Sequence, residues 1–135
     1  AFSNSMVGMV HALAHALGGV CHVPHGMANA ILLPWCLEYN IPKVPEYIAE
    51  LSGFLGGARA YLEPLEQAEE TISLIRNLLK KLNKISGIPE RLRDAKVLED
   101  QLPETAEAAI NDGALVYNPR EVSYEDALAV YGKAF

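Results

Sequence analysis

The feature that most constrains this sequence is its opening stretch, residues 1–37, which contains no Asp, Glu, Lys or Arg. The first charged side chain is Glu38. All four histidines of the chain lie in this stretch, and they are His11, His15, His22 and His25. An uncharged segment is suited to a buried position, because burial of an unpaired charge is costly. The stretch is therefore interpreted as the floor of a functional site, with the rest of the chain as its scaffold.

The spacing of apolar residues in this stretch predicts two helices, over residues 2–18 and 26–39. Helices that are apolar or small on every side are buried all round. Gly18-Gly19 is expected to end the first helix, because glycine is common just past helix ends. Pro34 is expected to kink the second helix or end it early. The two helices form an uncharged hairpin around which charged helices wrap.

The clearest helical pattern of the chain covers residues 64–86, with acidic residues at its start and lysines at its end, which complements the helix dipole. Its expected core-facing stripe is Leu65, Ala68, Ile72, Ile75, Leu79, Leu82 and Ile85. The remaining expected elements are a helix over 46–55, a turn or short helix over 89–95, a helix over 103–111 and a last helix over 123–133 behind a Ser123/Asp126 capping box. No segment alternates like a strand. The prediction is one all-α domain of six to eight helices over residues 1–135.

Composition excludes several classes of protein. The chain has 135 residues, half of them hydrophobic, which is enough to form a hydrophobic core. Its formal net charge of −6 is unsuited to binding nucleic acid, whose phosphates are also negative. The sequence contains no basic amphipathic helix of the kind that binds a membrane surface. The polar and glycine residues of the opening stretch argue against a membrane-spanning helix. Cys21 and Cys36 are interpreted as reduced thiols. We therefore expect a soluble, cytoplasmic protein.

His11 and His15 are four residues apart, so both project from one face of the first helix. Such a pair is a common metal platform, and His25 follows the glycine break, where the chain can fold back toward the same face. Imidazole suits Fe, Zn, Ni or Cu. Three alternatives stay open: histidines that only bond backbone carbonyls in the core, a zinc site of Cys21, His22, His25 and His15, and a Cys–His nucleophilic pair.

A buried divalent metal normally has an anionic ligand as well as imidazoles. The opening stretch supplies none, and the acids from Glu38 onward follow patterns typical of solvent-exposed faces. Either the chain binds no metal, or part of the site lies outside it. The second interpretation is favoured by the beginning of the sequence, because Ala1 already lies within a helical pattern. We therefore expect that the chain is a piece of a larger protein.

Three motifs point to a known family: Phe2-Ser3-Asn4, then Val10-His-Ala-Leu-Ala-His-Ala-Leu-Gly-Gly19, then Pro24-His-Gly-Met-Ala-Asn-Ala-Ile-Leu-Leu-Pro34. They resemble the signature of iron-containing (group III) alcohol dehydrogenases, and Asp112-Gly113 and Asn118-Pro-Arg120 resemble the C-terminal signature of that family. The resemblance covers essentially the whole chain. It implies the all-helical C-terminal domain of a dehydroquinate synthase-like fold, whose Rossmann-like N-terminal cofactor domain is absent from this chain.

The resemblance also implies a set of site residues. His11 and His25 match two metal ligands of the family, whose Asp and third His come from an upstream helix. His15 matches a histidine that stays off the metal, near the nicotinamide and substrate, and Phe2 matches an apolar wall of the substrate pocket. No role transfers to His22.

The implied activity is reversible oxidation of an alcohol to an aldehyde or ketone by a longer enzyme. The 135-residue chain in isolation is expected to be inactive. Its cofactors would be Fe²⁺, with Zn²⁺ as the alternative, and NAD or NADP bound through the absent domain. Its partners would be a small alcohol or aldehyde, the N-terminal domain and further copies of itself in a homo-oligomer. Two alternatives remain: a metal-free enzyme similar to maleylacetate reductase, and a stand-alone helical interaction module with structural histidines.

Overall fold

The computed structural model describes residues 7–57 and 63–135. Within these ranges the chain is helical and has no strand, which confirms the predicted all-α class. The α-helices are α2 (Met9–Cys21), α3 (His25–Asn40), α4 (Pro45–Glu50), α5 (Pro64–Ser86), α6 (Leu102–Ile110) and α7 (Tyr124–Ala134). The short 3-10 helices are η1 (Ser52–Leu55), η2 (Arg93–Ala95), η3 (Glu99–Gln101) and η4 (Gly113–Tyr117).

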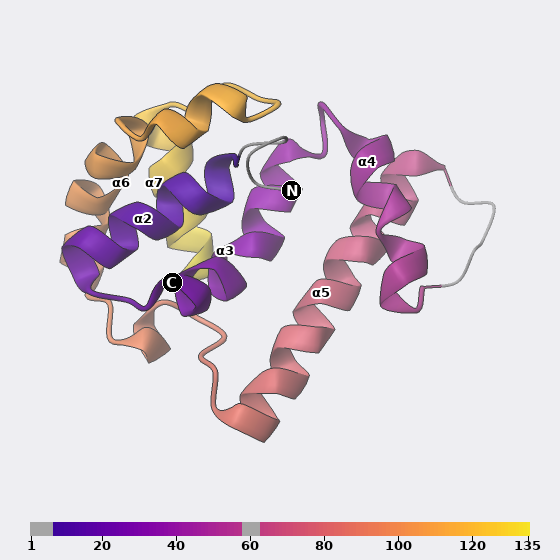
Figure 1. The fold of residues 1–135 in the computed structure, drawn as a ribbon, viewed down its shortest axis with the longest axis horizontal. Coiled ribbons are helices and arrows are strands. Elements are labelled where there is room, and N and C mark those ends of the chain that lie inside the picture. Colours follow the sequence, from indigo (N-terminus) through magenta and orange to yellow (C-terminus); the bar gives the residue numbers. More distant parts are fainter. Residues whose placement is uncertain (1–6, 58–62) are drawn as a thin grey trace.

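The uncharged hairpin of α2 and α3 lies at the centre of the main hydrophobic core. Figure 1 shows these two helices gathered with α6 and α7 on one side of the molecule, with α4 and α5 on the other. Leu13 and Leu17 of α2, Ile31 and Leu32 of α3 and Tyr131 of α7 are all fully buried there. The Tyr131 hydroxyl donates to the Leu13 carbonyl oxygen at 2.8 Å, so the one polar atom of this large side chain is satisfied inside the core.

Both boundaries of the first predicted helix need correction. Residues 7–8 are not helical, and α2 runs through Gly18-Gly19 instead of ending there. Glycine in a helix interior costs about 1 kcal/mol relative to alanine, which the packing of α2 against α3 and α6 offsets. The helix ends at His22, which adopts a left-handed conformation with φ of 57°. The N–H groups of His22 and Val23 then both donate to the Leu17 carbonyl oxygen.

The second predicted helix is confirmed to within one residue at each end, but Pro34 does not shorten it. Proline in a helix interior removes one backbone hydrogen bond and crowds the preceding turn. Pro34 is fully buried, and α3 contacts α2, α5 and α7 along its length. The helix therefore continues through the proline to Asn40, because tertiary packing on several sides outweighs the local cost.

A smaller core joins α4 to the first half of α5. Ile48 and Ala49 of α4 pack there against Ala68 and Ile72 of α5. The α5 boundaries match the prediction, and Gly87 ends the helix in the left-handed conformation with φ of 72°. The glutamate of its first turn and the lysine of its last turn complement the helix dipole as expected.

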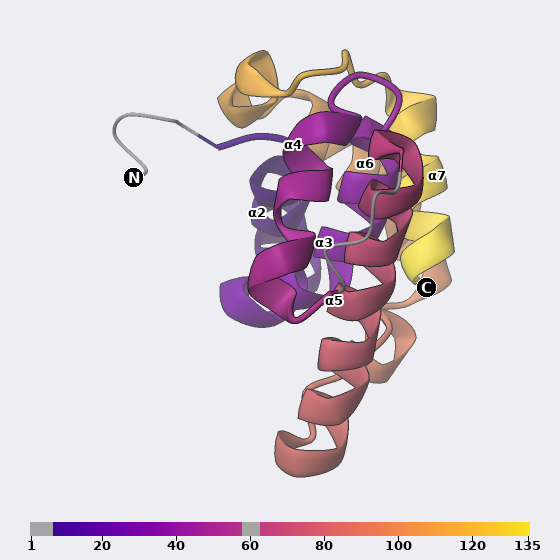
Figure 2. The ribbon, with the colours of Figure 1, turned by 90° about the vertical axis from the view of Figure 1, so that its right-hand side faces the viewer.

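The apolar stripe predicted along α5 is buried only in part. Ala68, Ile72 and Leu79 are buried, whereas Leu65 is 51% exposed and Ile85 is 83% exposed. Figure 2 shows that the C-terminal end of α5, which carries Ile85, extends past the other helices. A periodic stripe shows which face of a helix is apolar, but not how far along that face a partner reaches.

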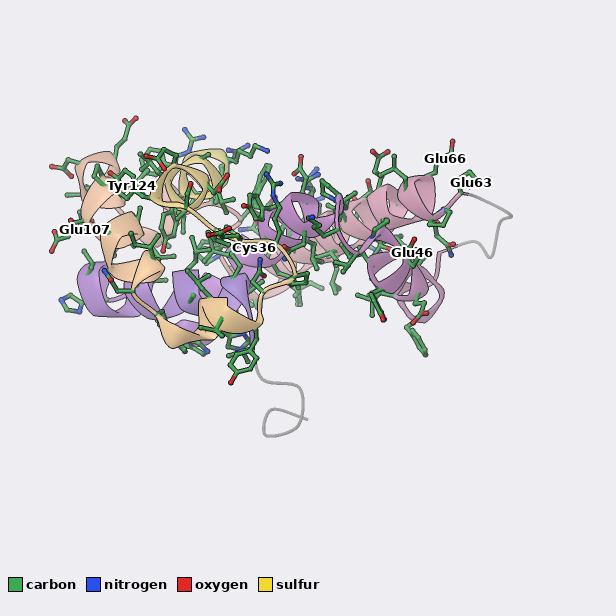
Figure 3. All side chains as sticks on the ribbon, turned by 90° about the horizontal axis from the view of Figure 1, so that it is seen from above. Cys36, Glu46, Glu63, Glu66, Glu107 and Tyr124 are labelled. Atoms are coloured by element: carbon green, nitrogen blue, oxygen red, sulfur yellow. The ribbon has the colours of Figure 1, made fainter. Side chains whose placement is uncertain are left out.

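The acidic side chains lie mainly at the periphery, as the sequence pattern predicted. Figure 3 shows Glu107 at the outer side of α6, and Glu46, Glu63 and Glu66 at the opposite end of the molecule, around α4 and the start of α5. All four are exposed. Within the described ranges, no helix is long and apolar enough to cross a bilayer.

Candidate metal centre

Three of the four histidines come together where α2 meets the start of α3. His11 and His15 stand one turn apart on α2, and His25 is the first residue of α3, behind the N-cap Pro24. The ring centroids of His11 and His25 lie 5.5 Å apart, and those of His15 and His25 lie 5.2 Å apart with nearly parallel planes. The two helices therefore bring the three imidazoles together across the turn, as the sequence predicted.

The alternative sites built on cysteine find no support in this geometry. His22 is exposed at the left-handed turn, outside the cluster of three rings. The Cys21 sulfur lies 3.5 Å from the hydroxyl of Thr105 on α6, and Cys36 is buried in the core, so both cysteines are free thiols as predicted. Burial raises the pKa of the Cys36 thiol far above its usual range, which suppresses the reactive thiolate.

The clustered imidazoles favour the uncharged form of His11. Partial burial lowers the pKa of His11, and the neighbouring His25 and His15 lower it further because like charges repel. A neutral imidazole is also the form that binds a metal ion. The electrostatics of the cluster therefore favour the neutral form of His11, which can bind a metal ion, over the protonated form, which cannot.

The donor set fits part of a metal site. An imidazole nitrogen binds zinc at about 2.0–2.1 Å, so two rings with centroids 5.5 Å apart are close enough to share one ion. In residues 7–57 and 63–135, however, no group of three or more His, Cys, Asp or Glu side chains is placed to hold a metal. His11 and His25 fit as half of a site.

One carboxylate does reach the histidines, and sequence reasoning missed it. Oδ2 of Asp112 lies 2.8 Å from Nδ1 of His15, across 97 residues of sequence. Its other oxygen, Oδ1, accepts from the Ala114 N–H at 2.8 Å at the N-terminus of η4. Partial burial raises the pKa of Asp112, but the bonds from Ala114 and His15 outweigh it, so this pKa lies below its usual value. The sequence draws attention to Asp112-Gly113 only as part of a motif that resembles the family's C-terminal signature, and it assigns no role to the carboxylate.

Asn29 is a second polar residue at the centre that spacing did not single out. Its Nδ2 lies 2.9 Å from His25 Nε2 and also donates to the His25 carbonyl oxygen. Its Oδ1 is buried and has no hydrogen-bond partner within the described part of the chain. Beside it lies an open groove of about 610 Å³, lined by Val7, Gly8, Val10, His11, Gly26, Asn29, Ala30 and Leu33. The groove is mostly apolar, with one imidazole and one amide on its wall.

The N-terminus of α2 is fixed by a residue distant in sequence. Oδ1 of Asn118 accepts from the Met9 N–H at 3.2 Å, and the Asn118 side chain also exchanges two hydrogen bonds with Asn40 at the end of α3. The loop after η4 therefore ties together both helices that carry the histidines. Phe2, the predicted substrate-pocket residue, lies outside the described residues.

The all-helical fold agrees with the comparison with known proteins. A sequence model described as "Fe-containing alcohol dehydrogenase family, C-terminal" matches residues 1–135. The chain belongs to the iron-containing alcohol dehydrogenase family, as an all-helical C-terminal domain of that family.

Individual relatives support the same assignment. The chain is 40% identical over its full length to 1,3-propanediol dehydrogenase of Klebsiella pneumoniae and 36% identical over 99% of its length to lactaldehyde reductase of Escherichia coli. Its structure superposes on an alcohol dehydrogenase from Oenococcus oeni with a TM-score of 0.91, at 35% identity and over 99% of the chain. In each case the chain spans only 34% of the relative's length.

Proposed function

We propose that residues 1–135 form the C-terminal, metal-binding domain of an alcohol dehydrogenase that oxidises a small alcohol to an aldehyde or ketone with NAD or NADP. The carrying observation is the convergence of His11 and His25 at 5.5 Å beside an apolar groove. The partial length relative to its relatives supports a longer polypeptide with a separate cofactor domain. On this proposal the isolated chain is inactive.

His11 and His25 would hold the metal together with an Asp and a His from upstream of this chain. Iron is the proposed metal because the family is iron-containing, and zinc is the alternative because imidazole suits both ions. When bound, such a metal supplies Lewis-acid polarisation of the alcohol or carbonyl oxygen. The lowered pKa of His11 favours the neutral, ligating form at neutral pH.

The chain's other residues would shape the reacting face. His15, half exposed and stacked on His25, is proposed to face the nicotinamide and the substrate, where its ring can orient the substrate or relay a proton. The groove beside His11 offers Val10 and Leu33 as apolar walls that keep water from the substrate. Phe2 is proposed to extend this wall.

We propose that the substrates are small. The relatives are named for 1,3-propanediol and lactaldehyde, both small and oxygenated, and the groove has one polar edge, at His11 and Asn29, in an otherwise apolar lining. We also propose that the enzyme works in the cytoplasm as a homo-oligomer.

The decisive test begins with the reading frame upstream of Ala1. The whole polypeptide should be expressed, its metal content measured, and the reduction of short aldehydes followed by NADH or NADPH absorbance with and without added Fe²⁺. We expect metal-dependent turnover in the long form and none in the 135-residue chain. Absence of any metal- and NAD(P)H-dependent reduction by the long form would refute the proposal.

The same measurements separate the two alternatives. A metal-free enzyme similar to maleylacetate reductase would keep its turnover after chelation, whereas the clustering of His11 with His25 favours a metal. A stand-alone interaction module would be encoded without an upstream cofactor domain. The family match over all 135 residues favours the enzyme domain over that module.

A further inference from the structure

The contact between Asp112 and His15 is a built arrangement rather than a chance surface pair. Both carboxylate oxygens are used, one by His15 Nδ1 and the other by the Ala114 N–H, each at 2.8 Å. Asp112 is also anchored through its own backbone, since its N–H donates to the Ala109 carbonyl oxygen at 3.1 Å. The carboxylate is thus held at a fixed place between α6 and η4 before it meets the imidazole.

This contact determines which nitrogen of His15 carries the proton. An ionised carboxylate can only accept hydrogen bonds, so a neutral His15 must carry its proton on Nδ1 to make the bond. Its Nε2 then keeps a free lone pair. The low pKa of Asp112 means that the carboxylate stays ionised through the neutral range.

The remaining ring contacts fix the plane of His15. Its ring is stacked on His25 with an interplanar angle of 19° and meets the His11 ring edge-on at a centroid distance of 6.1 Å. The side chain of His15 is 47% exposed whereas that of Asp112 is 23% exposed. Asp112 is therefore the more buried partner of the pair, and nearly half of the His15 side chain stays exposed.

We propose that Asp112 is a positioning residue that holds His15 in the Nδ1–H tautomer, with Nε2 presented as a hydrogen-bond acceptor on the accessible side of the three-histidine cluster. The catalytic consequence rests on the proposed function, because it takes His15 to face the substrate and nicotinamide. The tautomer itself does not depend on that function and can be observed without substrate.

The test uses Asp112→Asn in the full-length enzyme. The asparagine oxygen can still accept from the Ala114 N–H, while its amide N–H would donate to His15 Nδ1 and reverse the tautomer. Histidine-selective ¹⁵N NMR, assigned with His15→Ala, should show Nδ1–H in the parent protein and Nε2–H in Asp112→Asn. An Nε2–H tautomer in the parent would overturn the proposal, and so would an unchanged tautomer in the variant.

Turnover provides the second readout. Loss of an outer-shell residue that orients a metal-binding histidine costs about 10- to 100-fold in activity. We expect an effect of the same order at His15, so Asp112→Asn should lower kcat about 10- to 100-fold and leave KM and metal content within about twofold of the parent values. In a His15→Ala background the same substitution should have no further effect, because Asp112 acts through His15. An equal loss of kcat in that background would overturn the proposal.

Asp126→Asn is the matched control. Asp126 also accepts a backbone N–H at a helix N-terminus, from Ser123 at 3.1 Å, but belongs to the capping box of α7 and makes no hydrogen bond to His15. It should leave the His15 tautomer and kcat unchanged, so a loss equal to that of Asp112→Asn would overturn the proposal. Failure of the proposed function would look different: the parent enzyme itself would show no NAD(P)H-dependent turnover, whatever the tautomer.

Discussion

Replacement of Asn118 by alanine should destabilise the chain far more than its loop position suggests. The Asn118 side chain makes four hydrogen bonds: it accepts from the Met9 N–H and from Asn40 Nδ2, and it donates to Asn40 Oδ1 and to the Arg120 carbonyl oxygen. Each neutral hydrogen bond contributes about 0.5–1.5 kcal/mol net, and a buried partner left unpaired costs about 1–3 kcal/mol. Asn40, only 9% exposed, would lose both of these side-chain partners at once.

The expected loss in the free energy of unfolding is therefore about 3–4 kcal/mol, which is a large fraction of the 5–15 kcal/mol typical of small domains. Urea unfolding followed by circular dichroism measures it directly. Native-state hydrogen exchange should also show faster exchange at the Met9 amide, because the first turn of α2 loses its partner.

The matched control is Asn111→Ala. Asn111 is exposed and its side chain makes one hydrogen bond, to the Glu107 carbonyl oxygen at 2.8 Å. Its replacement should cost no more than about 1 kcal/mol. If Asn118→Ala cost no more than Asn111→Ala, water would be replacing the Asn118 bonds, and the loop would not be tying α2 to α3.

Other substitutions test the packing and the electrostatics. Ile72→Ala should cost about 2–5 kcal/mol in urea unfolding because Ile72 is 2% exposed, whereas Ile85→Ser should change stability by no more than about 0.5 kcal/mol because Ile85 is 83% exposed. Tyr131→Phe should cost about 1 kcal/mol by the same assay, since it removes the bond to Leu13. Folding lowers the pKa of His11, so protonation of this imidazole favours the unfolded chain. The metal-free protein should therefore lose stability as the pH falls below 6.5. His11→Gln should reduce that loss, and urea midpoints measured on either side of pH 6.5 will show it.

Features that depend on neighbours in sequence were predictable. The uncharged run predicted the central hairpin, the spacing of Leu79 and its apolar neighbours predicted α5, and the Ser123 capping box predicted the start of α7. Each of these signals acts within one or two helical turns, where the periodicity of the helix applies. The Gly18-Gly19 signal failed because it too is local, and contacts from α3 and α6 outweighed it.

In the candidate site, too, the features set by neighbouring residues were predictable from the sequence. The helical spacing of His11 and His15 placed both on one face of α2, and the turn before His25 brought the third imidazole to them. The roles of His11, His15, His25 and Phe2 came from the resemblance to the family, and they stay predictions until the experiments above are done.

The sequence by itself determined that the chain is helical, that its opening stretch is central, and that three histidines can meet there, because charge content and helical periodicity are read from nearby residues. Only the tertiary structure decided which carboxylate reaches the histidines. Asp112 and His15 are 97 residues apart, and no spacing rule connects them. Their contact exists because α6 packs on α2 and carries Asp112, just past its end, to Nδ1 of His15.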